Sequence, residues 1–221
     1  MEQQNYNLSC QFQMPECFKE IIDSGTEILL WEISESETEL REGLTLSPQA
    51  KNRLSSRKSS VHRKGYLAVR QLLKAYGIAP QLHQYESNGA PYLTDGRFLS
   101  ISHTKNVAAV AIANTPIGID VEHYQTKIDK IAPRFMHAKE VEAMPSLEQT
   151  NYLTQIWTAK EAIYKVLNTS GIHFARQIYI HPIEKKASKG TGEVYLKETT
   201  HNFNLYFFYF HNFCATLAKP N

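Results

Sequence analysis

Two acidic residues, Asp120 and Glu122, stand two apart in the segment IGIDVE, whose alternating pattern predicts a β-strand. Side chains two apart on a strand share a face and lie about 6.5–7 Å from each other. Two carboxylates at that separation can share one hard cation with a phosphorylated ligand. A helical segment, WTAKEAIYK, follows and contains Glu161 and Lys165, which would complete a site that handles a pyrophosphate.

Each of these features also has an ordinary structural explanation. A lone pair of acids on a strand is typical of a solvated face. Glu161 and Lys165 are four apart, which alone predicts a helix-surface salt bridge worth about 0.2–0.5 kcal/mol. Lys160 is harder to explain, because it falls near the middle of an apolar stripe formed by Leu153, Ile156, Trp157, Ile163, Tyr164 and Leu167. A lysine in that place must extend to solvent or reach a buried anion.

The surrounding sequence predicts the elements that position these groups. Little periodic signal marks residues 1–25. The predicted strands are EILLWEI at 27–33, the hairpin of FLSIS and VAAVAIA, then IGIDVE, GEVYLKE, LYFFYF and FCATLAK. One helix begins at Ser47-Pro48, and another runs through YLAVRQLLKAY and stops at Gly77. Residues 127–168 are predicted to be helical in pieces, broken at Pro133 and Pro145, with the last piece ending at Gly171.

The two halves of the chain repeat the same order of elements. In each half a helix precedes a hairpin, and His103 and His211 take similar places at strand ends. We therefore expect an α+β fold of two similar lobes, each with a long helix packed on a small, largely antiparallel sheet. The expected domains are residues 1–115 and 116–221.

Net charge, cysteine count and the distribution of apolar residues argue against several classes of protein. The net charge is only +2, but residues 51–74 carry eight basic and no acidic side chains, a local anion-attracting segment or a solvated helix face. Three cysteines without CxxC spacing give little support for zinc or a disulfide framework. The start, MEQQNYNLSC, lacks the features of a secretion signal, and no apolar run approaches the length of a membrane span. We expect a cytoplasmic protein with no membrane or nucleic-acid partner.

The segments SISH, IGIDVE and WTAKEAIYK, in this order and with about 40 residues between the last two, resemble the signature of 4′-phosphopantetheinyl transferases of the larger, surfactin-activating (Sfp) type. The resemblance covers roughly residues 45 to 170. It implies a monomer of two pseudo-twofold lobes, with the N-terminal lobe holding the nucleotide end of coenzyme A and the C-terminal lobe performing the transfer. The implied reaction moves the phosphopantetheine arm to a serine of an apo acyl or peptidyl carrier protein and releases 3′,5′-ADP.

The resemblance also assigns roles to residues. Asp120, Glu122 and Glu161 match the Mg²⁺ ligands, with Mn²⁺ left open, and Lys165 matches the lysine that contacts the pyrophosphate. RFMHAKEVEAM matches the segment with a candidate general base, which assigns Glu140, with Glu142 or water as alternatives. The residues expected to bind coenzyme A are Ser102, His103, Lys160, Arg53, Arg63 and Lys64. One departure is Ala90, which stands where the family usually has a lysine.

Two other classes of function stay open at the level of sequence. The same acids in a Mg²⁺-dependent hydrolase would cleave a nucleotide pyrophosphate with water as the nucleophile. The chain would alternatively be a non-catalytic module that binds coenzyme A or, through its basic segment, a nucleic acid. A steep dependence of nucleic-acid affinity on salt would favour that last alternative.

Overall fold

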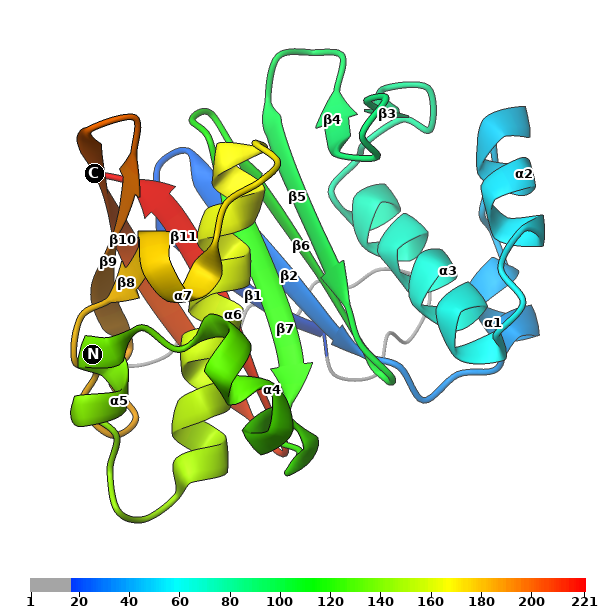
Figure 1. Cartoon of the computed structure of the whole chain (residues 1–221). Helices are drawn as coiled ribbons and strands as arrows, with labels where there is room; N and C mark the ends of the chain where they lie inside the picture. The colour runs from blue at the N-terminus through cyan, green and yellow to red at the C-terminus, as the bar shows by residue number, and fades with distance from the viewer. Residues whose placement is uncertain (1–16) are drawn as a thin grey trace. The chain divides into compact units, whose positions relative to one another are not determined.

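The protein was analysed as a computed structural model, which describes residues 17–221. The chain forms two compact units, Met1–Asn114 and Thr115–Asn221. Each unit combines helices with antiparallel strands, which confirms the predicted α+β class (Figure 1). No helix within the described range is both long and apolar enough to cross a lipid bilayer. The predicted twofold relation between the lobes stays a prediction.

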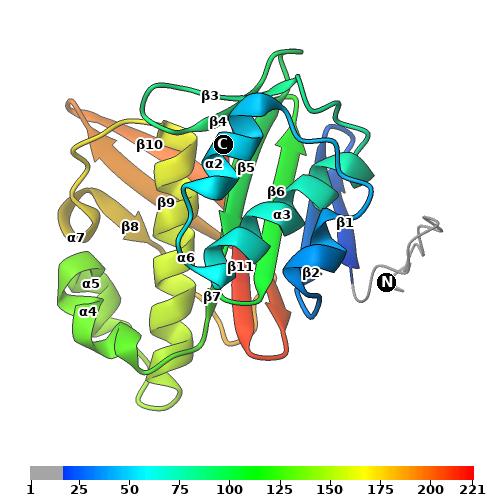
Figure 2. The same cartoon turned by 90° about the vertical axis from the view of Figure 1, so that its right-hand side faces the viewer.

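The first unit is built on a four-stranded antiparallel sheet in the order β1-β2-β6-β5, beside a small sheet of β3 and β4. Its elements are β1 (Cys17–Asp23), β2 (Thr26–Glu32), α1 (Glu37–Arg41), α2 (Pro48–Ser55), α3 (Ser60–Ala75), β3 (His83–Tyr85), β4 (Pro91–Leu93), β5 (Phe98–His103) and β6 (Val107–Ala113). Figure 2 shows α3 lying across the face of β5 and β6. Its buried residues, among them Leu67 and Leu72, form the core of this unit with Leu29 and Val110.

The second unit has a five-stranded antiparallel sheet in the order β7-β11-β10-β9-β8. Its elements are β7 (Gly118–His123), α4 (Lys127–Phe135), α5 (Ala138–Glu142), α6 (Gln149–Leu167), α7 (Phe174–Gln177), β8 (Ile178–Ile180), β9 (Lys189–Leu196), β10 (Thr199–Phe210) and β11 (Phe213–Pro220). The long helix α6 packs against β7 and β11. Its residues Ile156 and Ile163 are fully buried, as the apolar stripe predicts.

Several predicted boundaries need correction. Strand β1 falls in a stretch with little periodic signal and is held by its pairing with β2. Pro133 lies inside α4, where it removes one backbone donor, and the helix ends two residues later at Phe135. Helix α6 ends at Leu167 rather than Gly171, because Asn168 adopts a left-handed cap with a φ of 44°. The helix starting with Pro48 is confirmed, and the hydroxyl of Ser47 accepts a hydrogen bond from the amide of Ala50.

Candidate active site

The two acids of IGIDVE lie on one face of β7. Asp120 pairs with Thr216 of β11 across the sheet, and Glu122 pairs with Cys214. The alternate residues Ile119 and Val121 are buried on the opposite face. Asp120 is 6% exposed and Glu122 is half-buried, so the acidic face is mostly covered rather than solvated. The structure therefore does not support the alternative of a plain solvated strand face.

A glycine allows the helix α6 to approach this strand closely. A Cβ atom added to Gly118 would lie 1.9 Å from the backbone oxygen of Ala162. Any side chain there would force the strand and the helix apart. The neighbours of Ala162 on α6 include Glu161, so the close approach at Gly118 brings the carboxylate from the helix beside those of the strand.

Lys165 of α6 joins the helix to the strand. Its ammonium lies 2.8 Å from Oδ1 of Asp120 and donates a second hydrogen bond of 2.8 Å to the carbonyl of Ile119. Lys165 keeps 28% of its side chain exposed. The ion pair that the structure shows thus crosses from α6 to β7, whereas the helical spacing alone predicted a pair with Glu161.

Glu161 is half-buried next to these charges. Burial and the negative charges of Asp120 and Glu122 raise the pKa of its carboxyl to about 7, against an opposing effect of Lys165. Because Asp120 and Glu122 both act on the charge of Glu161, we treat the three carboxylates as one group, which we call the acid cluster. Its carboxylate oxygens are the hard donors that Mg²⁺ prefers.

The acid cluster is not a preformed set of metal ligands. Among residues 17–221, no group of three or more His, Cys, Asp or Glu side chains is gathered closely enough to hold a metal ion. The donor chemistry fits a divalent cation, but the carboxylates have to turn toward it. Asp120 would also exchange its contact with Lys165 for the cation.

Lys160 and Glu140 form a separate, closed ion pair. Their charged atoms lie 2.8 Å apart, and both side chains are 0% exposed. The Lys160 ammonium also donates to the backbone carbonyls of Phe135, Phe174 and Ile178, at 2.7, 3.2 and 2.7 Å. Burial lowers the pKa of Lys160, and the Glu140 charge opposes that shift.

The other oxygen contacts of Glu140 complete this pair. One carboxylate oxygen accepts from the amide of His137 at 2.7 Å, and the other accepts from the amide of Ile180 at 2.8 Å. Lys160 reaches a buried anion, one of the two places that its apolar stripe allows, and the carboxylate oxygens of Glu140 are enclosed by protein groups. These contacts give no support to coenzyme A binding by Lys160 or to Glu140 as the general base. Glu142, the alternative base, is exposed at the end of α5.

The predicted coenzyme A ligands of the first unit differ in their environment. Ser102 and His103 end β5, where Ser102 is 8% exposed and His103 is half-buried. His103 packs on Gly65 of α3, since a Cβ there would lie 2.8 Å from its Nδ1. Arg63 is held by Glu37 at 2.8 Å and by the carbonyls of residues 57 and 58, which gives it a structural role and no support as a ligand. Lys64 is half-buried beside it.

Arg53 of α2 stacks over the ring of Tyr85, with its Cζ 3.7 Å from the ring centroid. No motif marked Tyr85, because the contact joins a helix to a strand more than 30 residues away. The resemblance therefore named the arginine but not the aromatic side chain that holds it.

Comparison with known proteins extends the motif evidence. Residues 116–218 match the 4′-phosphopantetheinyl transferase superfamily. The 4′-phosphopantetheinyl transferase of Bacillus subtilis is 33% identical over 100 residues, which cover 42% of this chain and 44% of that protein. The 4′-phosphopantetheinyl transferase gsp of Aneurinibacillus migulanus is 29% identical over 109 residues, 47% of this chain and 46% of that protein. The 4′-phosphopantetheinyl transferase psf-1 of Bacillus pumilus is 27% identical over 118 residues, 50% of each.

These matches confirm the resemblance predicted from the motifs. The chain spans about half the length of the curated relatives that it matches. All of Asp120, Glu122, Glu161 and Lys165 lie within the segment that matches the superfamily. The chain is thus similar to the 4′-phosphopantetheinyl transferase superfamily over residues 116–218.

Proposed function

We propose that the protein transfers the phosphopantetheine arm of coenzyme A to a serine of an apo carrier protein. The observation that carries the proposal is the acid cluster, formed by β7 and α6 within the segment that matches the superfamily. The serine oxygen forms a bond to the phosphorus that bears the pantetheine arm. The bond from that phosphorus to the oxygen of 3′,5′-ADP breaks, and the serine proton passes to a base or to water.

The residues of the second unit suit the parts of this reaction. Asp120, Glu122 and Glu161 would hold Mg²⁺ or Mn²⁺, which when bound neutralises the pyrophosphate and the charge on the leaving 3′,5′-ADP. Lys165 is partly exposed, so its ammonium can turn from Asp120 toward a pyrophosphate oxygen. Glu140 stays in its buried pair with Lys160, which leaves exposed Glu142 or water as the acceptor of the proton.

The first unit would hold the nucleotide end of coenzyme A. Ser102, His103, Arg53 and Lys64 remain the proposed ligands there. Ala90 removes a cation that the family usually provides, so we expect Lys105 or Arg97 to take its place. Arg97 is held by Asp95 at 2.6 Å and is the less available of the two. We further propose that the protein acts in the cytoplasm as a monomer. Carrier proteins are acidic, which suits an enzyme of slightly basic charge.

Intact-mass analysis of a panel of apo carrier proteins tests this function. Each carrier is incubated with the protein, coenzyme A and Mg²⁺, and with one component left out in turn. The proposal predicts that a carrier gains the mass of one phosphopantetheine arm only when all components are present. Release of phosphopantetheine without any carrier would instead identify a hydrolase, and tight binding of coenzyme A without either product would identify a non-catalytic binder.

A further inference from the structure

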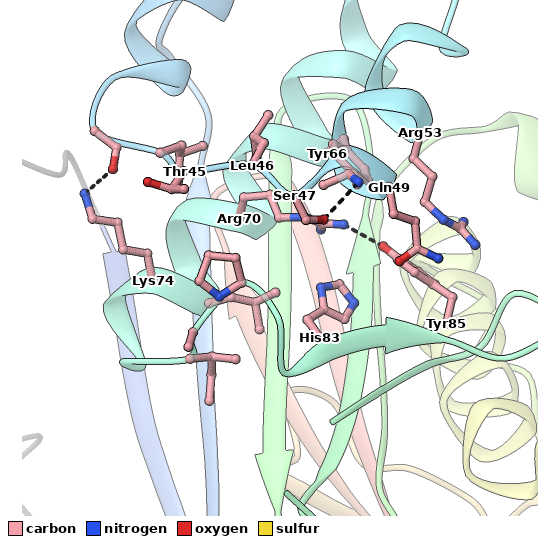
Figure 3. A pocket seen from close by; sticks show the side chains of 17 residues that line it. Thr45, Leu46, Ser47, Gln49, Arg53, Tyr66, Arg70, Lys74, His83 and Tyr85 are labelled. Atoms are coloured by element: carbon pink, nitrogen blue, oxygen red, sulfur yellow. Dashed lines mark hydrogen bonds between the residues drawn. The ribbon is translucent and has the colours of Figure 1, made fainter. Parts of the chain in front are cut away.

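The first unit contains a cavity of about 180 Å³ between α2, α3 and β3, which we call the α2–α3 cavity (Figure 3). Among the described residues that line it, three are basic, Arg53, Arg70 and Lys74, and none is acidic. Arg53 and Arg70 are partly buried, whereas Lys74 is exposed and donates a hydrogen bond to the carbonyl of Gly43. Partly buried charges normally face a partner of opposite sign. The wall of the α2–α3 cavity therefore carries an excess of positive charge that suits an anion.

Aromatic side chains hold two of the cations in place. Arg70 lies over the ring of Tyr66, with its Cζ 3.8 Å from the ring centroid, and its Nη2 donates a hydrogen bond of 2.8 Å to the hydroxyl of Tyr85. The guanidinium of Arg53 stacks on the ring of Tyr85, the same residue whose hydroxyl accepts the bond from Arg70. Both guanidiniums are thus fixed without a carboxylate, and Figure 3 shows them beside the same space as His83. A rigid pair of planar cations is well suited to a carboxylate or phosphate group.

Three buried polar atoms of residues that line the cavity have no hydrogen-bond partner among the residues that the structure describes. They are Nη1 of Arg70, the hydroxyl oxygen of Tyr66, and Nε2 of His83, a residue that is 8% exposed. Buried polar atoms in folded proteins are nearly always paired, so each exception needs an explanation such as a ligand. Burial, together with Arg70 and Arg53, lowers the pKa of His83 to about 3. Its imidazole is therefore neutral near pH 7 and offers one donor and one acceptor nitrogen.

The remainder of the cavity wall is apolar and includes Leu46, Leu73 and Ile78. Pockets for drug-sized molecules have volumes of about 300–1,000 Å³, so this cavity suits a smaller molecule. We propose that the α2–α3 cavity binds a compact organic anion, a carboxylate or phosphate monoester with an apolar body, whose charged end contacts Arg53, Arg70 and His83.

This site is distinct from the transfer chemistry. Ser102, His103 and Lys64 do not line the cavity, and all of the acid cluster belongs to the other unit. Only Arg53 is shared with the proposed coenzyme A ligands. The inference therefore does not depend on the proposed function, and binding of a small anion needs neither a metal nor a carrier protein.

Isothermal titration of the full-length protein with benzoate and with phenyl phosphate tests the proposal. We expect at least one of these probes to bind at least tenfold more tightly than benzyl alcohol, which lacks the charge, and inorganic phosphate, which lacks the apolar body. Arg53→Gln and Arg70→Lys should each weaken that binding at least tenfold. Lys51→Gln is the matched control, because it removes a charge from an exposed position of the same helix outside the cavity.

Thermal unfolding and circular dichroism establish whether each variant is folded. If Arg53→Gln does not fold, Arg70→Lys still tests the site, because it keeps the positive charge and removes only the planar guanidinium. The proposal is overturned if neither probe binds more tightly than its controls, or if Arg53→Gln and Lys51→Gln bind alike. An equal loss of coenzyme A binding in Arg70→Lys would also overturn it, because the cavity would then be part of the nucleotide site. A protein that binds the probes but modifies no carrier would contradict the proposed function alone.

Discussion

Helix α6 carries two lysines, five residues apart, and each lies 2.8 Å from a carboxylate oxygen. The side chains of Lys160 and Glu140 are both 0% exposed, whereas the side chains of Lys165 and Asp120 are 28% and 9% exposed. Protein donors and acceptors surround the first pair, while two further carboxylates adjoin the second. Ion pairs of equal length thus differ in what they can do, and burial and neighbouring charge decide the difference.

The closed pair cannot exchange partners without leaving a charge unpaired in the core. In the open pair the Lys165 side chain is 28% exposed, so its ammonium can turn to another anion when a cation takes its place beside Asp120. The comparison therefore favours a structural role for Lys160 and Glu140, and it supports the proposed chemical role of Lys165 and the acid cluster.

The largest expected effect comes from breaking the closed pair. Glu140→Ala should lower the free energy of unfolding by about 3–5 kcal/mol, because it leaves the Lys160 ammonium buried and uncompensated. Urea denaturation measures the change. Glu142→Ala, on the same short helix but exposed, should change stability by less than about 0.5 kcal/mol. Equal effects of the two substitutions would show that the buried pair is not the structural element that we describe.

Substitutions in the acid cluster should instead reduce activity strongly and stability only slightly. Asp120→Asn and Glu161→Gln should each slow release of 3′,5′-ADP by at least about a hundredfold, the effect of losing one strong electrostatic contact to a transition state. Their midpoints of urea denaturation should change little compared with Glu140→Ala. Near-normal turnover by either variant would remove the cluster from the mechanism.

The third prediction concerns the approach of α6 to β7. Gly118→Ala places a methyl group against the carbonyl of Ala162, so the helix and strand must separate. Overpacking of this kind costs about 1–3 kcal/mol, and the displaced Glu161 should reduce activity further. Gly25→Ala is the control, because its methyl group would meet only the end of the Asn114 side chain. Similar losses of stability for both variants would argue against a special role for Gly118.

The smallest expected effect is a pH dependence that comes from Glu161. Its folded pKa, about 7, lies above the ordinary value of 4.5, so the folded state binds this proton more tightly than the unfolded state. The resulting stability is complete below pH 4.5 and is lost as the pH rises through about 7. In metal-free buffer, the wild-type protein should lose stability over this range relative to Glu161→Gln. Parallel pH profiles for the two proteins would contradict the raised pKa.

The sequence predicts those features of the site that follow from the periodicity of a single strand or helix. Alternation placed Asp120 and Glu122 on one face of β7, and the helical stripe showed that Lys160 had either to extend to solvent or to reach a buried anion. The partner of Lys160 was not predictable, because Glu140 comes from a short helix 20 residues earlier and the contact depends on tertiary packing. Alignment alone therefore gave Glu140 a catalytic role that its buried contacts do not support.

The other features that the sequence did not predict depend on contacts between elements that are distant in the chain. The α2–α3 cavity combines Arg53, Arg70, His83 and Tyr85 from two helices and a three-residue strand, and no spacing rule connects them. Strand β1 was missed for the same reason, since it depends on pairing with β2 rather than on its own pattern. In the sequence, the only sign of the close contact at Gly118 is a glycine two residues before Asp120.

Electron paramagnetic resonance of Mn²⁺ in the presence of coenzyme A measures directly whether the acid cluster holds the metal ion. If the acid cluster is the metal and pyrophosphate site, the wild-type protein and Glu142→Gln should bind the ion alike, whereas Asp120→Asn and Glu161→Gln should lose most of that binding. Unchanged Mn²⁺ affinity in the folded Asp120→Asn and Glu161→Gln variants would contradict the assignment.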